Sequence, residues 1–392
     1  MSDKRIEYHR IYQDTAYLKL VQTILNEGFT VRNERTGVGT IGINGYEAKY
    51  DMSRHARYLE NGDLEVDNFP LLTTKKVFLK GIIHELLWLM RGETNIKYLV
   101  DNDVNIWNDW PLKAYNQQYA ILRTVPPISR SGSQQANMED FIDAIRYQPG
   151  FAEVYGELGP VYGKQWRKWD AGIDFNAGPE DSHVAKHEHR IWEYLPNSEG
   201  YHMEGIAIGA RRYIDQLADM VSLLKTDPYS RRNIVTAWNP ADIEEMTKSG
   251  LPPCHMQFQA LVRPNPEDED RPYLDLVMYQ RSADCFLGVP FNVASYSMLL
   301  ILLAKEVGFM PGTLIHNMGS AHIYLNHIDQ IKEQLSREPV RSPTLTISPN
   351  SSEANCRTVL ETEKNSVSAY EISDFVLTNY KPYGAIKGSV AV

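Results

Sequence analysis

The sequence predicts an α+β fold in which helices pack against one main sheet. Residues 256–262 and 273–281 alternate apolar and polar side chains as paired strands do, and a charged, proline-rich segment connects them. Residues 78–91 and 293–307 are long apolar runs typical of buried helices. Because strands and helices do not alternate in a regular βαβ series, a mixed sheet is expected rather than a doubly wound parallel one.

The remaining elements follow from periodicity and capping residues. Residues 14–27 are expected to form a helix that Asp14 caps, since their apolar side chains fall on one face. Residues 212–225 are expected to form another helix, with Ile214 on its inner face. Two further segments complete the prediction: a strand at 233–238 and a strand-to-helix passage at 315–330.

We expect a single catalytic domain, 1–392, that carries polar excursions. Four stretches are expected to be insertions into it: 53–67, 111–152, 170–210 and 350–366. The composition, with 43% hydrophobic and 23% charged residues, is that of a globular protein of ordinary core size. No internal repeat is visible along the chain.

Charge and cysteine content exclude several functional classes. The formal net charge of -10, from 40 Lys and Arg against 50 Asp and Glu, argues against general nucleic-acid binding. Three cysteines are too few for a disulfide framework, and an odd number cannot all pair within one chain. The N-terminus lacks the apolar segment of a signal peptide, and the run 296–304 is too short to span a bilayer. We therefore expect a cytoplasmic protein that does not contact a membrane.

The sharpest motif is LPPCHMQFQ at 251–259, where Cys254 follows two prolines and opens a strand. The prolines stiffen the approach to the cysteine. A thiolate attacks carbon far better than a thiol, so a catalytic cysteine needs positive charge nearby. This motif alone leaves two interpretations equally open: a nucleophile, or a small buried hydrophobic residue.

A second motif, QRSADCFLGVPFNVASY at 280–296, places polar residues in an apolar stretch, where they must find partners. Arg281 could serve both a phosphate and the thiolate. Asn292 alone would more often be a turn-capping residue. A third motif contains Arg231 and Arg232, which are either a solvated surface or a forked clamp for a phosphate.

Taken together, these segments resemble thymidylate synthase and its close relatives. The matching blocks occur in family order and are spread along the chain from residue 34 to residue 392. They are residues 34–40, 69–76, 82–99, 106–110, 158–167, 227–239, 251–255, 280–296, 321–330 and 386–392.

The resemblance implies transfer of a one-carbon unit from 5,10-methylenetetrahydrofolate to C5 of deoxyuridylate (dUMP). Cys254 would add to C6 of uracil and make C5 nucleophilic. Glu85 would organise water and move protons near O4, and Tyr162 would assist removal of the C5 proton.

The same resemblance implies the binding residues. The 5′-phosphate would be held by Arg35, Arg281 and Ser282, and by Arg231 and Arg232 of a neighbouring subunit, so a homodimer joined through the sheet is expected. The 3′-hydroxyl would be bound by His322 and Tyr324. The folate would contact Lys75, Ile106, Trp107, Leu251, Asp284, Gly288, Phe291 and the closing C-terminal residue Val392. His255 would support the site from behind, and no metal is implied, so His183, His187 and His189 are expected to lie in a solvated insertion.

Asn292 favours uracil over cytosine. Uracil presents an N3–H donor and an O4 acceptor, and a carboxamide can answer both. The deoxycytidylate hydroxymethylases of the superfamily carry Asp at this place. Because a flipped amide would suit cytosine, neighbours must fix its orientation.

The product depends on whether a hydride or water reaches the transferred methylene. Trp107 and Val392 favour reduction to thymidylate. Ser320 stands where the family usually has a carboxylate, and Gly384 falls where many relatives have proline. With the long insertions, these departures favour a phage-type dUMP hydroxymethylase, which would work in the host cytoplasm. The alternative is a thymidylate synthase. An inactive nucleotide- or RNA-binding relative is a third possibility, against which Cys254 and the acidic charge both speak.

Overall fold

The computed structural model describes residues 12–32, 37–122, 135–174, 190–194, 210–249, 251–348 and 370–390. Its largest sheet has six strands in the order β1-β2-β11-β10-β9-β8. They are β1 (Phe29–Val31), β2 (Thr40–Asp51), β8 (Ile234–Thr236), β9 (His255–Arg263), β10 (Tyr273–Asp284) and β11 (Met310–Tyr324). Neighbouring strands are antiparallel except β10 and β11, which are parallel. This mixed sheet with packed helices confirms the predicted fold class.

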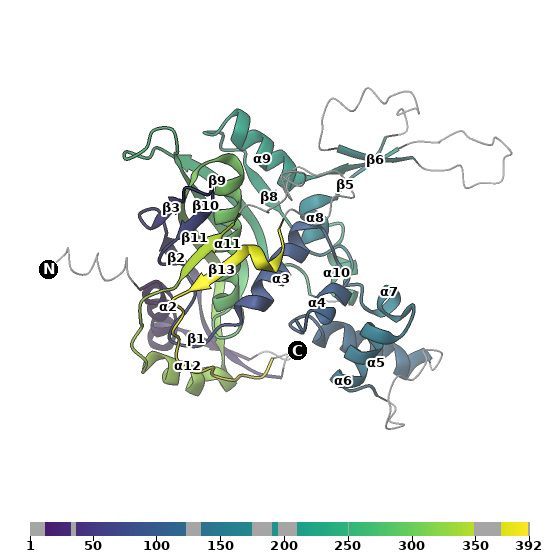
Figure 1. Ribbon diagram of the computed structural model, residues 1–392. Helices are drawn as coiled ribbons and strands as arrows, with labels where there is room; N and C mark the ends of the chain where they lie inside the picture. The colour runs from purple at the N-terminus through teal and green to yellow at the C-terminus, as the bar shows by residue number, and fades with distance from the viewer. Residues whose placement is uncertain are drawn as a thin grey trace.

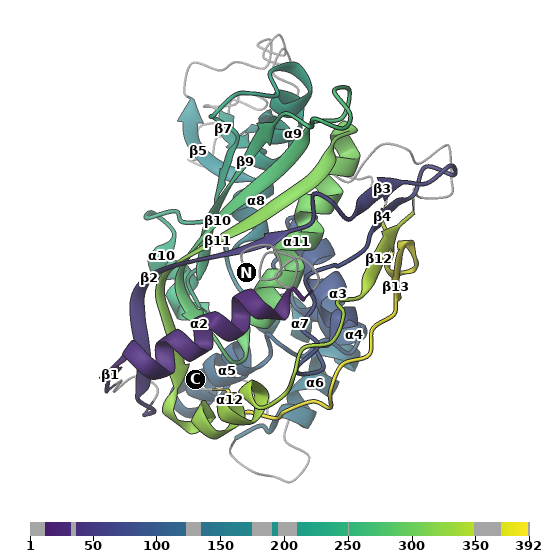
Figure 2. The ribbon, with the colours of Figure 1, turned by 90° about the vertical axis from the view of Figure 1, so that its left-hand side faces the viewer.

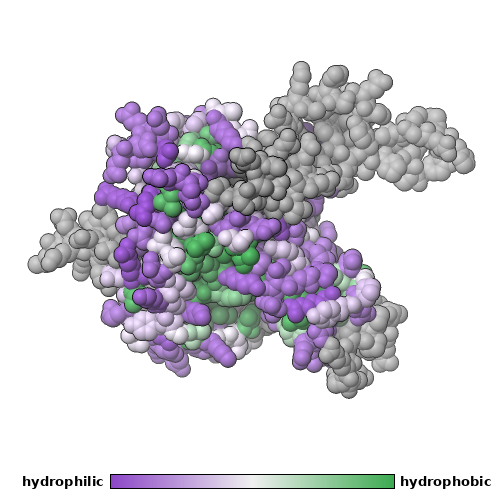
Figure 3. All heavy atoms as spheres, in the orientation of Figure 1, coloured by the Kyte–Doolittle hydropathy of each residue, from purple (hydrophilic) through white to green (hydrophobic). Residues whose placement is uncertain are grey.

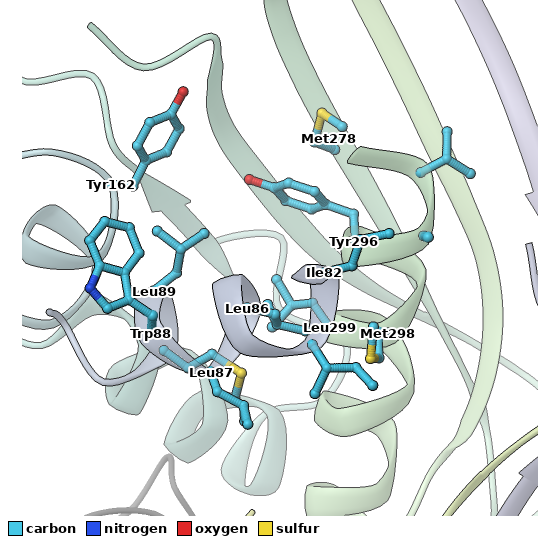
Figure 4. Packing of buried hydrophobic residues seen from close by; sticks show 14 of the residues in the cluster. Ile82, Leu86, Leu87, Trp88, Leu89, Tyr162, Met278, Tyr296, Met298 and Leu299 are labelled. Atoms are coloured by element: carbon cyan, nitrogen blue, oxygen red, sulfur yellow. The ribbon is translucent and has the colours of Figure 1, made fainter. Parts of the chain in front are cut away.

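Three helices cover one face of this sheet. The central helix α11 (Gly288–Val307) packs on β10 and β11, and α3 (Leu79–Met90) packs against α11 (Figure 1). Helix α2 (Asp14–Glu27) lies across β2 and β11 (Figure 2). Leu86 of α3 approaches Leu299 of α11 in the buried layer (Figure 4). Because full burial of a leucine stabilises by roughly 1.5–3 kcal/mol, this layer holds α3 firmly in place.

Helix α11 is longer than the sequence predicted. It begins at Gly288, five residues before the expected start at 293. The carboxylate of Asp284 accepts hydrogen bonds from the backbone N–H groups of Phe286 and Leu287, which shapes the turn into the helix. Its 20 residues are long and apolar enough to cross a membrane, but 78% of the apolar window is buried inside the fold. Helix α11 is therefore the core helix of this domain.

Two other details of the sequence prediction are wrong. Asp14 does not cap its own helix: its buried carboxylate accepts hydrogen bonds from the backbone N–H and hydroxyl groups of Thr73 and Thr74. Ile214 ends strand β7 (Ala210–Ile214), and helix α9 (Gln216–Thr226) begins after it. The side chain of Asp215 accepts from the N–H of residue 218 and so starts the helix there.

The stretches expected to be insertions contain regular structure where they are described. Part of 53–67 forms β3 (Ala56–Tyr58) and β4 (Leu64–Val66), which join β12 (Thr344–Ile347) and β13 (Phe375–Thr378) in a second sheet. Part of 111–152 forms α6 (Met138–Tyr147), α7 (Phe151–Tyr155) and most of α5 (Asp109–Leu122). Strands β5 (Trp169–Asp174), β7 and β6 (Arg190–Tyr194) form a third sheet, which projects at the upper right of Figure 1. Their status as insertions stays a prediction, and 350–366 lies outside the described residues.

Short elements complete the fold. They are helices α4 (Lys97–Asp101), α8 (Gly163–Arg167), α10 (Ile243–Ser249) and α12 (Ile328–Leu335) and the single turns η2 (Leu325–His327) and η4 (Ile372–Asp374). On the face shown in Figure 3 the described residues are mainly hydrophilic, and apolar side chains gather near its middle. The predicted passage from strand to helix at 315–330 is confirmed by β11, η2 and α12.

Candidate active site

Cys254 lies on a loop that Arg281 holds from the neighbouring strand. The backbone N–H of Arg281 donates to the carbonyl of Cys254 at 2.8 Å. Its guanidinium donates through Nε to Pro253 O and through Nη2 to Pro252 O, both at 2.9 Å. Cys254 itself is partly exposed. One arginine thus fixes the loop and brings a permanent positive charge close to the cysteine, the surroundings that favour a thiolate.

Tyr162 approaches the cysteine from the other side. It stands just before α8 with φ 27° and ψ -88°, a conformation that costs a non-glycine residue about 1–3 kcal/mol. Its hydroxyl accepts a hydrogen bond from the N–H of Cys254 at 2.8 Å. Burial raises the pKa of Tyr162 well above its usual range, so the hydroxyl keeps its proton. The strained backbone places a proton-bearing group beside Cys254.

Glu85 adds a carboxyl group to this neighbourhood. Its residue keeps some exposure, but protein surrounds the carboxyl, which accepts a hydrogen bond from Nε1 of Trp107 at 2.8 Å. Burial raises the pKa of Glu85 from 4.5 to about 7. Its charge in turn helps to raise the pKa of Tyr162 and of Tyr296, whose rings lie along the same side of α3 (Figure 4). A carboxyl with a pKa near 7 can both give and take a proton at neutral pH.

His255 packs against Tyr162 and contacts the hydroxyl of Tyr296. Its ring stacks on Tyr162 with centroids 4.3 Å apart, and its Nδ1 is 2.7 Å from the hydroxyl of Tyr296. Burial lowers the pKa of His255 to about 3, so the ring is neutral at physiological pH. A neutral ring in this place positions Tyr162 without adding charge to the site.

Asn292 has partners that the sequence analysis missed. Its Oδ1 accepts a hydrogen bond from Nε2 of Gln280 at 3.1 Å, and Oε1 of Gln280 lies 2.9 Å from Nε2 of His316. Both Gln280 and His316 are buried. The sequence signal that could have revealed these partners is a polar residue at a core-facing position of each strand, Gln280 in β10 and His316 in β11.

The ends of β10 and β11 bring a second group of predicted residues together. Asp284 pairs with His322 across the two parallel strands. The ring of His322 meets that of Tyr324 edge to face at 5.4 Å, and its Nδ1 is 3.3 Å from Ser320 O. Burial lowers the pKa of His322. Ser282 lies near the same C-terminal end of β10 as Asp284. These side chains therefore stand at the ends of the two central strands, close to the start of α11.

The residues expected to bind folate fall into two groups. Trp107, Ile106 and Phe291 pack against the core beside Glu85 or at the start of α11, while Leu251 and Gly288 are partly exposed. Lys75 is only 5% exposed. Its Nζ donates to Phe286 O and lies 3.7 Å above the ring of Phe286. Burial lowers the pKa of Lys75 to about 8, so in this arrangement its ammonium is occupied inside the protein.

The C-terminal segment lies against Phe286 as well. Nε2 of His327 is 2.9 Å from Ser389 O, and the ring of His327 stacks on Phe286 at 4.9 Å. A Cβ added to Gly388 would come within 2.6 Å of that aromatic ring. The tail therefore fits closely against Phe286 and His327. Val392 and Arg35 lie outside the described residues.

Arg231 and Arg232 are exposed next to the edge strand β8. The carbonyl of Arg231 accepts from Nε2 of Gln259 at 2.9 Å. The face of the sheet opposite α11 carries a hollow that extends from β8 across to β2 and does not include Cys254. It is lined by Gly45, Tyr46, Glu47, Ile234, Gln257, Gln259, Val277, Tyr279, Asn317, Met318 and Gly319.

Within the described part of the chain, no three His, Cys, Asp or Glu side chains are grouped as a metal would need. His183, His187 and His189 lie outside that part, as does Cys356. Cys285 is buried, and burial raises the pKa of its thiol well above the usual range, which disfavours a reactive thiolate.

Comparison with known proteins gives consistent matches. A family model described as thymidylate synthase matches residues 15–392. A thymidylate synthase of Mycoplasma pneumoniae is 39% identical over 376 residues, which are 96% of this chain and 99% of that protein. Thymidylate synthases of Phytoplasma mali and Listeria monocytogenes are each 38% identical over 377 and 385 residues, with the same shares of both chains. The family model therefore spans all of the site residues described above.

Proposed function

The chain belongs to the thymidylate synthase family, and from this premise we propose that it methylates dUMP reductively to thymidylate. It is a one-carbon transferase, and its co-substrate is 5,10-methylenetetrahydrofolate. The observation that carries the proposal is the pair of contacts at Cys254: Arg281 holds its loop and Tyr162 holds its N–H. A buried structural cysteine needs neither a clamped loop nor a strained tyrosine.

The nucleophilic step follows from these contacts. The thiolate of Cys254 adds to C6 of uracil, and the electron pair of the C5–C6 double bond moves toward C5 and O4. C5 then forms a bond to the methylene carbon of the folate and later loses its proton. The guanidinium of Arg281 favours the thiolate form of Cys254 before attack.

Proton transfer falls to Glu85 and Tyr162. Glu85, with its pKa near 7, exchanges protons with water at O4 as charge builds up there. Tyr162 keeps its proton, and its hydroxyl orients a water molecule that accepts the C5 proton and passes it to solvent. Elimination of tetrahydrofolate leaves an exocyclic methylene on C5. A hydride from the tetrahydrofolate then reduces it, Cys254 departs from C6, and thymidylate and dihydrofolate are released.

Two further sets of contacts complete the substrate site in this proposal. Asn292 recognises the uracil edge, and His322 and Tyr324 bind the 3′-hydroxyl. The phosphate is held by Arg35, Arg281 and Ser282. The folate lies against Trp107, Ile106, Leu251, Asp284, Gly288 and Phe291, and Val392 closes over it. Lys75 would have to leave Phe286 before it could bind the glutamate tail of the folate.

The preference for thymidylate over hydroxymethylated dUMP as the proposed product is supported by the comparisons with known proteins. The sequence favoured the hydroxymethylase, partly because of the long insertions. The relatives named thymidylate synthase align over 96% of this chain, so the extra length does not set it apart from them. The second candidate remains the dUMP hydroxymethylase, in which water adds to the methylene and tetrahydrofolate leaves unoxidised. Ser320, in place of the usual carboxylate, is the observation that favours it.

One incubation separates the products. The protein is given dUMP and methylenetetrahydrofolate, the nucleotide is weighed by mass spectrometry, and dihydrofolate is followed by absorbance. We expect a methylated nucleotide and one dihydrofolate for each turnover. A hydroxymethylated nucleotide without dihydrofolate would replace the proposal with the second candidate.

The nucleophile has its own test. Release of tritium from C5-labelled dUMP reports the attack at C6, whichever product follows. We expect Cys254→Ser to abolish release and Cys285→Ala, the matched change of a buried thiol, to retain it. If the unaltered protein releases no tritium, it is an inactive nucleotide- or RNA-binding relative.

We also propose that two copies of the chain share each site, with Arg231 and Arg232 reaching the phosphate bound by the partner. Support comes from the exposure of both arginines at the sheet edge and from the hollow beside them on the open sheet face. Two inactive variants, Cys254→Ser and Arg232→Glu, should recover activity when their subunits are mixed, because one site per dimer is then intact. Mixtures that exchange subunits but stay inactive would refute the sharing.

A further inference from the structure

We propose that Gln280 and His316 determine the choice of uracil over cytosine by fixing the orientation of the Asn292 carboxamide. This inference rests on the proposed function, since it assumes that Asn292 faces the pyrimidine. It adds two positioning residues, neither of which contacts the base. The three side chains form a hydrogen-bonded row from the middle of β11, through β10, to the first turns of α11.

The row starts from a backbone group whose role is unambiguous. The carbonyl of Ser282 can only accept a hydrogen bond, and it lies 3.0 Å from one end of the Gln280 amide. That end must therefore be the NH2 group, Nε2. With Gln280 flipped, its oxygen would face the carbonyl oxygen of Ser282 in a buried site, which is strongly unfavourable.

His316 secures the opposite end of Gln280. Oε1 of Gln280 can only accept, so Nε2 of His316, at 2.9 Å, carries the ring hydrogen. His316 is fully buried, and burial lowers the pKa of its ring to about 3. The ring is therefore neutral, with its one N–H directed at Gln280. Its Nδ1 has no hydrogen-bond partner among the described residues, as an unprotonated nitrogen permits.

Asn292 receives its orientation from the second N–H of Gln280. This N–H points at the Asn292 amide atom 3.1 Å away, which must then be the oxygen, Oδ1. The NH2 group of Asn292 consequently occupies the other position. Each assignment follows from the one before it, from the Ser282 carbonyl to Asn292.

A fixed Asn292 amide can distinguish uracil from cytosine because the orientation of the bound base is fixed as well. The bond from Cys254 to C6 and the grip on the phosphate set the position of the ring, so its N3 and C4 edge meets Asn292 in one order. Uracil places an acceptor at O4 and a donor at N3, whereas cytosine reverses both. An amide that is free to flip would serve either base, whereas one that is held serves only one of them, which is uracil in the proposed function.

The test measures selectivity rather than activity alone. Tritium release from C5-labelled dUMP and from C5-labelled deoxycytidylate gives kcat/KM for each. We expect Gln280→Met to lower the dUMP-to-deoxycytidylate ratio roughly tenfold or more, since it removes the hydrogen bond that holds the amide. His316→Phe should lower the ratio less, because the Ser282 carbonyl still orients Gln280.

Gln334→Met is the matched control. Gln334 is also fully buried, and its amide bonds to Thr74 and to Tyr17. We expect Gln334→Met to change both rates together and to leave the ratio unaltered. The proposal is overturned if Gln280→Met, or His316→Phe where Gln280→Met does not fold, keeps the ratio of the unaltered protein. Absence of tritium release from dUMP in the unaltered protein would instead refute the proposed function, so the two failures are distinguishable.

Discussion

Replacing Glu85 with glutamine should stabilise the protein at alkaline pH while it stops the proton transfer of the site. Burial raises the pKa of Glu85 from 4.5 to about 7, so the folded protein holds this proton more tightly than the unfolded chain does. The stability that this tighter hold contributes is therefore full below about pH 4.5 and is lost as the pH rises through about 7. Above that range the fold contains a buried negative charge.

The size of the effect follows from the pKa. At about 1.4 kcal/mol per pH unit, the charged carboxyl costs the fold about 3 kcal/mol. A chain of 392 residues unfolds with an entropy of roughly 0.8 kcal/mol per degree, so removing the charge should raise Tm by about 4 °C. Glutamine keeps the oxygen that accepts from Trp107, so the hydrogen bond at this point is retained.

The assay is thermal unfolding of Glu85→Gln and the unaltered protein in parallel. We expect a Tm difference of about 4 °C near pH 8.5 and of about 1 °C or less near pH 5. Glu60→Gln, at an exposed glutamate, should show no such dependence on pH. An equal Tm difference at both pH values would show that burial does not raise the pKa of the Glu85 carboxyl. The proposed role of Glu85 in proton transfer would then fail as well.

Three other substitutions test separate contacts. Tyr162→Phe removes the acceptor of the Cys254 N–H, and leaving that group unpaired should lower kcat for tritium release roughly 10- to 100-fold; a change in KM alone would contradict this. Asp14→Ala leaves the buried backbone N–H groups of Thr73 and Thr74 unpaired, at about 1–3 kcal/mol each, so unfolding should become easier by roughly 2–6 kcal/mol. Denaturant titration checks that loss, and an unchanged midpoint would refute it. Gly388→Ala places a methyl group 2.6 Å from the ring beneath the tail. Steady-state kinetics should show a higher KM for the folate and an unaltered KM for dUMP; equal changes in both would count against a role of the tail at the folate.

The residues of the site that the sequence could predict are those carried by compact motifs. Cys254 and Arg281 stand in segments whose polar residues have no local reason to be there, and the structure brings both together. The main elements were also predictable, because apolar periodicity in α3 and α11 reflects burial directly. Arg231 and Arg232 were identified by the same local signal, and their role stays a proposal.

The partners of these residues were not predictable, because they come from distant parts of the chain. His316 meets Gln280 across 36 positions, and Asp14 meets Thr73 across 59. Asp14 was expected to cap its own helix because an acidic residue at a helix start usually does so. Tertiary contact with the loop at Thr73 gave its carboxylate four hydrogen-bond donors instead. These contacts outweighed the local preference of an acidic residue for capping its own helix.

The sequence by itself determined the family and the α+β class and singled out Cys254 as the proposed nucleophile, because these depend on residue types in a fixed order. Only the tertiary structure decided how the chemical groups are tuned. It placed the Glu85 carboxyl where burial raises its pKa to about 7, and it gave Asn292 a row of partners that fixes its orientation. Both effects depend on which atoms surround a side chain, and those atoms are brought near by folding rather than by proximity in the chain.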